Sequence, residues 1–463
     1  MKTREADQII SGGFLCHEMG LGKTRIASAA ILANPMRTLV LTTKSTIGGW
    51  LAELRHQSNF AFDCIEYTKN KTTLTPGRPT AVVATHHSIL KTNITWFRDQ
   101  NFDRLVVDEV HVIRNMGAIF GALREITARI RWGLTATPFN NSKSDIRAYT
   151  EFLHPGMPVD EFRTYMLRKR RTEVVDGGPQ LVASKHVYDF ESPEEHRLYE
   201  YVSGRIQDVN NWIAGNAHRL PRHVQGLMKA TLILRERQAA IHPQMVLDAE
   251  RVWRAQLPAQ LGNPDDVMGW DPAKVTKFRH IVNMVKADQK NGQSTMIVTH
   301  FTTELNLLKK SLESCGIHVD VLNGKTKPAD RTKLEEPFTE AFELRDILYS
   351  LPIPNDVCDI ISSMVGASRV LLLQIQAGGV GISLPWVHHV INTSPDWNPF
   401  LELQAVYRAY RINTSHDVKV TSMYFRDTVD IQIQNRQKEK FVKSLDWTGD
   451  APESISEFIN MPV

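Results

Sequence analysis

The chain has 463 residues, which is enough for two or three domains that each bury their own core. Its 42% hydrophobic and 23% charged residues are ordinary for a globular protein, and no apolar run is long enough to cross a membrane. Lys and Arg total 55 against 51 Asp and Glu, and the net charge of +4 is compatible with nucleic acid without demonstrating it. The four cysteines lie far apart, so they indicate neither a disulfide framework nor a zinc site, and we expect an intracellular protein.

The first element in chain order is a phosphate-binding loop. It comprises His17, Glu18, Met19, Gly20, Leu21, Gly22, Lys23 and Thr24. Gly20 and Gly22 allow a tight turn that points backbone N–H groups at a polyphosphate, and a helix from 25 to about 32 adds the positive end of its dipole. Lys23 can reach the β- and γ-phosphates of ATP, and the Thr24 hydroxyl can bind Mg²⁺. A glycine turn before a helix is often only a turn, so this prediction needs support from the rest of the chain.

Two carboxylates follow a strand that we expect at 105–107. The strand is a continuous apolar run, typical of a buried parallel sheet, and such sheets bind ligands at the carboxyl ends of their strands. Asp108 is suited to hold Mg²⁺, and Glu109 to orient and deprotonate the attacking water. An Asp-Glu pair alone is most often part of a solvated loop. Combined with the phosphate loop, it predicts a site for ATP hydrolysis.

Arginines mark two later segments. The run 168–171 is entirely basic, and it could contact DNA phosphates or form an ordinary solvated face. Arg408 and Arg411 are three residues apart, so on a helix they share one face with Gln404 one turn earlier. Two guanidinium groups that project together across a cleft can stabilise the charge on a transferring phosphoryl group. We therefore expect Arg408 and Arg411 to act in hydrolysis, although a solvated helix face is the alternative.

Several further segments resemble one protein family. They are residues 37–44, 50–54, 84–86, 131–141, 369–381, 396–399 and 404–412. Together with the two nucleotide motifs, they make the chain similar to the Swi/Snf-like branch of superfamily-two helicases, which are ATP-driven translocases on double-stranded DNA. The resemblance runs from about residue 12 to about residue 440, and its most specific part is the W-N-P segment with the arginine segment that follows it.

The resemblance implies an α/β fold of two RecA-like parallel-sheet lobes with a helical insertion between them. It implies that ATP and Mg²⁺ are the cofactors, that double-stranded DNA is the partner, and that Glu109, Arg408, Arg411 and Gln404 are catalytic. The residues implied to couple the ATP site to DNA are His111, Thr135, Thr137, Gly379 and Gly381. The residues implied to contact DNA are Thr43, Lys44, Thr85, His86, Arg168, Arg170 and Trp397. We expect a nuclear protein if the source is eukaryotic, or one located wherever viral DNA is handled.

The alternation of strands and helices divides the chain. We expect an ATP-binding lobe at 1–157, a helical inter-lobe region at 158–272, a second lobe at 273–445 and a tail at 446–463. Strands are expected near 38–42, 80–84, 104–108 and 131–135, and again near 295–299, 319–322, 369–374, 388–393 and 418–425, with none at 156–270. An insert at about 340–366 matches no family segment. It could dock a protein partner, or it could be a local helix packed on its own lobe.

Two other functions stay open. The chain could be a strand-separating RNA or DNA helicase, because D-E-x-H boxes occur in those enzymes too, or a nucleotide-inert scaffold descended from such an enzyme. The W-N-P segment and Trp132 favour the double-stranded DNA translocase. An active enzyme is favoured over a scaffold by the joint presence of Lys23, Asp108, Glu109, Arg408 and Arg411. The sequence leaves open whether the pathway is remodelling, repair, transcription or viral genome handling.

Overall fold

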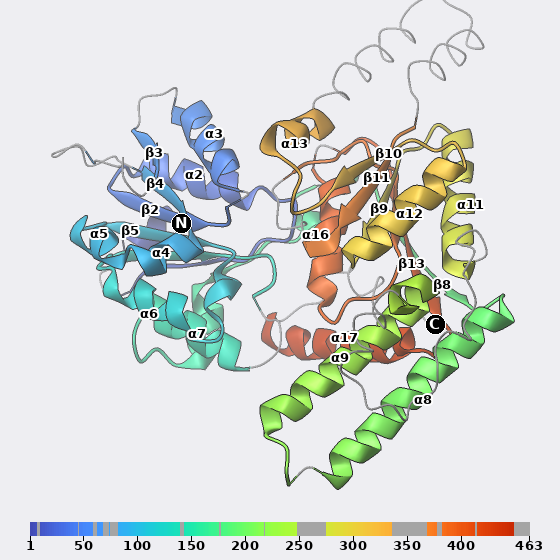
Figure 1. The fold of residues 1–463 in the computed structure, drawn as a ribbon. Helices are drawn as coiled ribbons and strands as arrows, with labels where there is room; N and C mark the ends of the chain where they lie inside the picture. The colour runs from blue at the N-terminus through green and yellow to red at the C-terminus, as the bar shows by residue number, and fades with distance from the viewer. Residues whose placement is uncertain are drawn as a thin grey trace, which may run out of the picture.

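Two α/β lobes lie side by side, and a helical hairpin projects from the second of them (Figure 1). The computed structural model describes residues 1–6, 10–44, 46–58, 63–67, 74, 82–138, 143–175, 177–216, 218–247, 275–335, 368–376, 382–412 and 414–448. The insert at about 340–366, the two glycines Gly379 and Gly381, and the chain beyond residue 448 lie outside the described residues.

The first lobe is built on a seven-stranded parallel sheet with the strand order β3-β4-β2-β5-β6-β1-β7. Its strands are β1 (Ser11–Leu15), β2 (Thr38–Thr42), β3 (Cys64–Glu66), β4 (Val82–His86), β5 (Arg104–Asp108), β6 (Ile130–Leu134) and β7 (Met166–Leu167). Its helices are α1 (Lys2–Glu5), α2 (Lys23–Ala33), α3 (Ile47–Ser58), α4 (His87–Thr92), α5 (Ile94–Asp99), α6 (Ala118–Glu125) and α7 (Lys143–Leu153). Three short 3₁₀ turns, η1 (Val110–Ile113), η2 (Val159–Tyr165) and η3 (Arg171–Glu173), complete the lobe.

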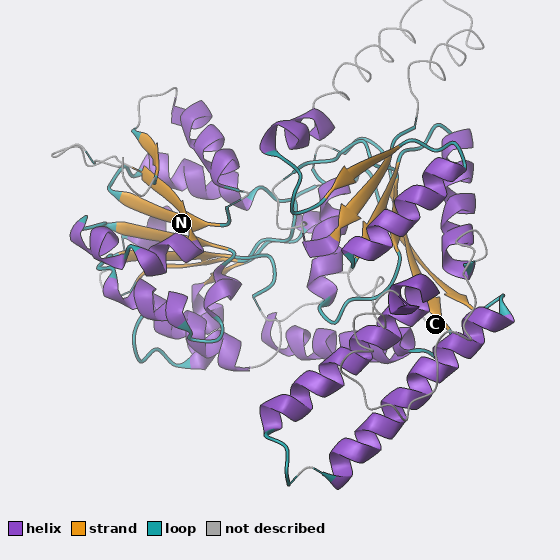
Figure 2. Ribbon diagram, in the orientation of Figure 1, coloured by secondary structure: helices purple, strands orange, loops and turns teal. Residues whose placement is uncertain are grey.

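Alternate residues of the central strands pack on opposite faces of this sheet. Leu39 and Leu41 belong to one apolar cluster, whereas Val40 and Val106 belong to another that contains Trp132. Helices cover both faces (Figure 2), so the strands are buried on both sides and read as continuous apolar runs. Because the strands are parallel, the loops that follow β1 and β5 emerge at the same edge of the sheet.

The second lobe is built on a six-stranded parallel sheet with the order β10-β11-β9-β12-β13-β8. Its strands are β8 (Leu181–Tyr188), β9 (Thr295–Thr299), β10 (Val319–Leu322), β11 (Val370–Gln374), β12 (His389–Asn392) and β13 (Val418–Phe425). Its helices are α11 (Thr276–Lys290), α12 (Thr302–Ser314), α13 (Pro328–Glu335), α16 (Pro399–Ala409) and α17 (Val429–Thr448). Between β8 and α11 stands the hairpin of α8 (Pro193–Gly215) and α9 (Arg222–Ile241).

The predicted fold class is confirmed, and each predicted strand is present within two residues of its expected bounds. The expectation of no strand at 156–270 is wrong, because β7 and β8 both fall within that stretch. β7 has only two residues, and β8 is an edge strand paired with β13 alone, with most of its residues half-buried or exposed. Edge strands therefore lack the continuous apolar run by which the buried strands are recognised.

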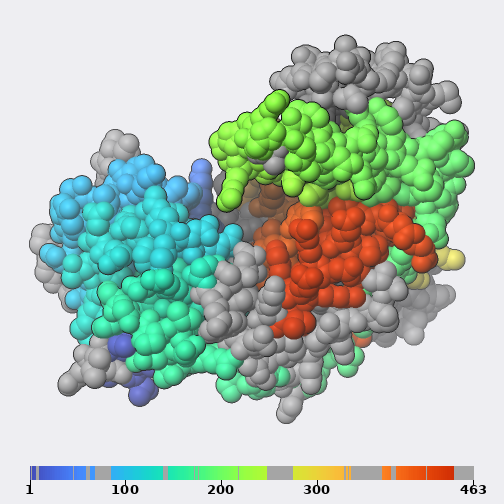
Figure 3. Space-filling model, turned by 90° about the horizontal axis from the view of Figure 1, so that it is seen from below, coloured from blue at the N-terminus to red at the C-terminus, as the bar shows by residue number. Residues whose placement is uncertain are grey.

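The α8–α9 hairpin is anchored on the second lobe. Ser192 accepts a hydrogen bond from the backbone N–H of Glu195 and caps α8, and proline at the first helical position fits that start. Tyr199 of α8 and Ala240 of α9 share an apolar cluster with Phe425 and the first turns of α17. In Figure 3 the hairpin (green to lime) borders α17 (red) on the face seen from below. Among the described residues, no helix combines the length and apolar character needed to cross a membrane.

Candidate nucleotide site at the junction of the lobes

The predicted phosphate loop joins β1 to α2. Gly20 (φ +79°) and Gly22 (φ +67°) both adopt left-handed backbone, which favours glycine, and α2 begins directly at Lys23. The Lys23 Nζ donates hydrogen bonds to the carbonyl oxygens of His17 (3.0 Å) and Glu18 (3.1 Å), so the loop wraps its own lysine. Burial lowers the pKa of Lys23, and the nearby charges of two carboxylates act in the opposite direction. The loop therefore presents a partly desolvated cation at the end of a parallel sheet.

Those two carboxylates are Asp108 and Glu109, at the end of β5. Asp108 Oδ2 accepts hydrogen bonds from Thr42 Oγ1 (2.8 Å) and Trp50 Nε1 (2.9 Å), which fix its orientation. Burial, with the charge of Glu109 added, raises the pKa of Asp108. Burial also acts to raise the pKa of Glu109, but His111 at 3.2 Å and the charge of Lys23 outweigh it, and the pKa lies below its ordinary value. Neighbouring groups thus keep Glu109 ionised at neutral pH, as a general base requires.

Glu109 also has an unusual backbone. Its φ of +50° lies in the left-handed region, where non-glycine residues are uncommon and which costs free energy unless the surroundings fix it. The preceding residue is held by His87, whose buried ring lies 3.0 Å from the carbonyl oxygen of Asp108. Burial lowers the pKa of His87 to about 4, so this ring is neutral at physiological pH. Trp50, Thr42 and His87 were not singled out as members of the site from the sequence.

The predicted coupling residues Thr135 and Thr137 lie beside the end of β1, the strand that leads into the phosphate loop. Both side chains are buried, and the Thr135 N–H donates to the carbonyl oxygen of Leu15 at 3.2 Å. The Thr137 N–H donates in turn to Thr135 Oγ1 at 3.1 Å. His111 lies in η1 against Glu109. Thr135 is therefore bonded to the strand that leads into the phosphate loop, and His111 lies against Glu109.

The two predicted arginines come from the second lobe. Arg408 Nη1 and Arg411 Nη2 each donate to the carbonyl oxygen of Ile382 at 3.1 Å, so the two guanidinium groups converge. They do not share a helix face as predicted, because α16 ends at Ala409. Thr414 Oγ1 accepts from the Arg411 N–H (2.9 Å) and donates to the Ala409 carbonyl (2.7 Å), so a side chain terminates the helix. Gln404 lies on α16 and is half-buried.

The phosphate loop lies directly against this end of α16. A Cβ built on Gly20 would stand 3.4 Å from the Tyr410 carbonyl oxygen and 3.7 Å from the Arg411 Cα. Met19 packs on the apolar cluster of the second lobe, and the charge of Arg411 contributes to lowering the pKa of Lys23. The described lobes therefore meet where the loop lysine, the two carboxylates and the two arginines come together.

The residues predicted to contact DNA occupy three places. Thr43, Lys44, Thr85 and His86 lie at one edge of the first sheet, because β2 and β4 are paired with Thr42 opposite His86. The side chain of Thr85 is fully buried, whereas Lys44 is exposed. Arg168 and Arg170 follow β7 and lie beside the phosphate loop, where the charge of Arg168 contributes to lowering the pKa of His17 to about 4, an effect due chiefly to burial. Trp397 is on the second lobe.

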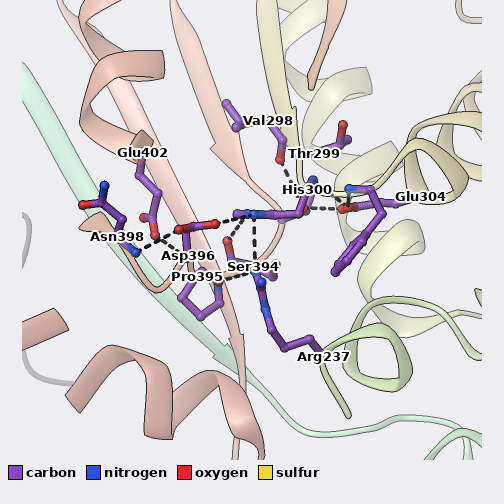
Figure 4. Close-up of polar contacts among 12 residues, drawn as sticks. Arg237, Val298, Thr299, His300, Glu304, Ser394, Pro395, Asp396, Asn398 and Glu402 are labelled. Carbon is purple, nitrogen blue, oxygen red and sulfur yellow. Dashed lines mark hydrogen bonds and ion pairs between the residues drawn. The ribbon is translucent and has the colours of Figure 1, made fainter. Parts of the chain in front are cut away.

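A buried polar network fixes the loop that carries Trp397 (Figure 4). Arg237 of α9 donates to the carbonyl oxygen of Pro395 at 2.8 Å, and His300 lies 3.3 Å from an Asp396 oxygen and 2.7 Å from the Ser394 carbonyl oxygen. The loop ends with Asn398, which caps α16 by accepting from the Phe400 N–H, and proline follows at the first helical position. The W-N-P letters are thus a helix start.

Glu402 of α16 also belongs to this network, and its burial can be tested through the pH dependence of protein stability. It is 1% exposed, it accepts from the Asp396 N–H at 2.6 Å, and burial raises its pKa from 4.5 to about 7. Because the folded state holds the proton more tightly than the unfolded state, this group contributes stability below pH 4.5 that is lost as pH rises towards 7. We expect wild type to lose about 3 kcal/mol relative to Glu402→Gln over this window. Urea unfolding of both proteins from pH 4.5 to 8 measures it, and a pH-independent difference would contradict the assignment.

Comparison with known proteins agrees with this geometry, which defines a two-lobed, helicase-like ATPase. The SNF2-related domain family matches residues 2–186, and the helicase conserved C-terminal domain matches residues 354–413. The chain is therefore similar to Swi/Snf-family proteins in both of its lobes.

Among its relatives is a probable global transactivator of Orgyia pseudotsugata multicapsid polyhedrosis virus, 25% identical over 100% of this chain and 92% of that protein. Another is the SWI/SNF-related matrix-associated actin-dependent regulator of chromatin subfamily A member 1 of Mus musculus, 24% identical over 92% of this chain and 40% of that protein. The solved SWI2/SNF2 ATPase core of Sulfolobus solfataricus in complex with double-stranded DNA is 20% identical, with a TM-score of 0.39, over 98% of this chain and 93% of that one. The chain thus spans nearly the whole viral relative but less than half of the murine one.

Proposed function

We propose that the chain hydrolyses ATP while bound to double-stranded DNA and uses the hydrolysis to move along it. The observation that carries the proposal is the convergence of the phosphate loop, the Asp108–Glu109 pair and the end of α16 at one junction between the lobes. Phosphoryl transfer needs positioning and charge stabilisation above all, and these three parts supply both.

The oxygen donors at the start of α2 and at the end of β5 fit Mg²⁺. The Thr24 hydroxyl and the Asp108 carboxylate offer the oxygen ligands that this ion prefers. Asp108 Oδ2 is oriented by two side chains, while Oδ1 accepts the Glu109 N–H at 3.0 Å and retains a second lone pair. When bound, Mg²⁺ would neutralise charge on the β- and γ-phosphates.

The remaining roles follow from the geometry of the chain. Lys23 and the N–H groups of the loop bind the phosphates, and Glu109 orients a water molecule and removes its proton. Arg408 and Arg411 bring positive charge from the other lobe, where negative charge grows as the phosphate leaves. Since Glu109 lies in one lobe and the arginines in the other, turnover depends on the relative placement of the lobes.

Double-stranded DNA is the partner that we propose for the two lobes. Lys44 at the edge of the first sheet and the loop around Trp397 in the second lobe offer contacts on both lobes. The relatives' names, which refer to chromatin and to a viral transactivator, favour action on nuclear or viral DNA. The insert at about 340–366 stays a candidate for a protein partner.

Duplex DNA should therefore stimulate ATP hydrolysis, with little sequence preference and strong dependence on salt. Contacts made to phosphates release counterions, so DNA affinity should fall about 10- to 100-fold between about 50 and about 200 mM salt. The measurement is ATP turnover with double-stranded DNA, single-stranded DNA, RNA and no nucleic acid, at several salt concentrations.

The same experiment separates the alternatives. Equal or stronger stimulation by RNA would favour a strand-separating helicase. Absence of hydrolysis under every condition, by a folded protein, would favour a nucleotide-inert scaffold.

A further inference from the structure

Arg171 is the buried member of the basic run 168–171. The residue is 8% exposed, whereas the side chain of Lys169 is 58% exposed and that of Arg170 is 24% exposed. A cation that is withdrawn from solvent is poorly placed to reach a DNA phosphate. Arg168 is half-buried, with its Nε and Nη1 atoms shielded from solvent, so Arg171 is the most buried member of the run and Lys169 the most exposed.

On one side, Arg171 holds the phosphate loop. Its backbone N–H donates to Glu18 Oε2 at 2.7 Å, and Glu18 is itself 5% exposed. The Glu18 N–H donates to the Lys169 carbonyl oxygen at 3.1 Å, and the Glu18 carbonyl oxygen accepts from Lys23 Nζ at 3.1 Å. The start of η3 is thus bonded to the loop residue that holds the phosphate-binding lysine.

On the other side, Arg171 packs on the second lobe. Its guanidinium carbon lies 4.1 Å from the centre of the Tyr410 ring, a close cation–π contact. Tyr410 is the C-cap of α16, is 7% exposed, and donates from Oη to the Pro179 carbonyl oxygen at 2.9 Å. The next residue in the chain is Arg411. Arg171 therefore bonds to the phosphate loop through its backbone N–H and contacts the end of α16 through its guanidinium group.

We propose that Arg171 is a positioning residue that sets the distance between the phosphate loop and the arginine-bearing end of α16. This inference rests on the proposed function, because it concerns the placement of Arg411 relative to bound phosphate. Arg171 reaches both lobes at once, through Glu18 in one and the Tyr410 ring in the other. A displacement of about 1 Å among reacting groups can cost about 10²-fold in rate, so a loosened contact should be visible in turnover.

The test is the kinetics of Arg171→Ala and Arg171→Lys with saturating duplex DNA. Both variants should lower kcat for ATP about 10- to 100-fold, because an ammonium group cannot reproduce a planar stack. DNA affinity, measured by fluorescence anisotropy, and the thermal unfolding midpoint should stay near wild type. Arg197→Ala is the matched control, since that arginine is 72% exposed on α8, away from the junction.

Variants of the partner ring separate positioning from general stability. Tyr410→Phe keeps the ring under Arg171 and should retain most of the turnover, whereas Tyr410→Ala should resemble Arg171→Ala. The Arg171→Ala/Tyr410→Ala double variant should be no slower than either single variant. Each substitution alone already breaks the contact between Arg171 and Tyr410, so the second one removes nothing more.

Three outcomes would overturn the inference. The first is turnover by folded Arg171→Ala or Arg171→Lys within about twofold of wild type. The second is a multiplicative loss of turnover in the double variant, and the third is weakened DNA affinity with kcat unchanged at saturating DNA. The last would make Arg171 a DNA contact. If wild type itself shows no ATP turnover with any nucleic acid, the proposed function fails instead.

Discussion

Replacing Lys23 with alanine should abolish ATP turnover and leave the fold intact. The ammonium group is the only side-chain cation of the loop 17–24, so nothing else there can neutralise the β- and γ-phosphates. The Lys23 side chain bonds to two carbonyl oxygens of its own loop, and the alanine variant loses these bonds. It also no longer has to bury a charged group, which is unfavourable, so the two effects on the free energy of unfolding oppose each other. The measurement is turnover with saturating duplex DNA, alongside the thermal unfolding midpoint.

Glu109→Gln is the matched comparison for this variant. It should still bind ATP and Mg²⁺, since the loop and Asp108 are untouched, but hydrolyse ATP about 10²–10⁴-fold more slowly because the general base is lost. Near-normal turnover by either variant, once folding is established, would rule out this site as the place of hydrolysis.

Arg411→Ala should lower turnover by about 10³–10⁵-fold, the range that an arginine supplied across a cleft contributes, while ATP affinity barely changes. The first lobe alone carries Lys23, Asp108 and Glu109, so nucleotide binding does not need the arginine. The guanidinium converges with that of Arg408 on the Ile382 carbonyl oxygen and meets the phosphoryl group only when the lobes are correctly placed. The measurement is DNA-stimulated turnover together with the affinity for a fluorescent ATP analogue.

Two further variants make this result specific. Arg411→Lys should not restore turnover, because a point-charge ammonium cannot reproduce the planar fork of a guanidinium. Arg426→Ala should behave as wild type, because that arginine is 60% exposed and pairs with Asp189 on the surface of the same lobe. Turnover by Arg411→Ala near that of wild type would exclude a mechanism in which the second lobe completes the site. DNA that bridges both lobes would stimulate hydrolysis by favouring the placement that brings Arg411 to the phosphate.

The sequence predicted the parts of the site in which one short segment carries both the chemistry and its structure. Lys23 follows a glycine turn at the start of a helix, and Asp108 follows an apolar strand, so their positions could be inferred without knowledge of the rest of the fold. The partners of these residues could not be inferred in that way. Trp50 donates to Asp108 from 58 positions away, and only the pairing of β2 with β5 brings the two segments together.

Arg171 and the end of α16 illustrate a second limit. The basic run looked uniform in sequence, and burial of one member depends on the contact between lobes. The helix was expected to continue through Arg411, but it ends at Ala409. The Thr414 hydroxyl accepts from the Arg411 N–H and donates to the Ala409 carbonyl oxygen, in place of bonds within a helix. β8 was missed because an edge strand need not be apolar throughout.

The order of strands along the chain has a practical consequence for protein engineering. β7 is the last strand to join the first sheet and β8 the first to join the second, so neither sheet takes a strand from the other half of the chain. Between them, Gly177 and Gly178 are exposed and both have positive φ, at +70° and +98°. A cut at this peptide bond would give two fragments, each with a complete sheet and all of its crossover connections. The two halves could then be expressed as separate polypeptides and reassembled.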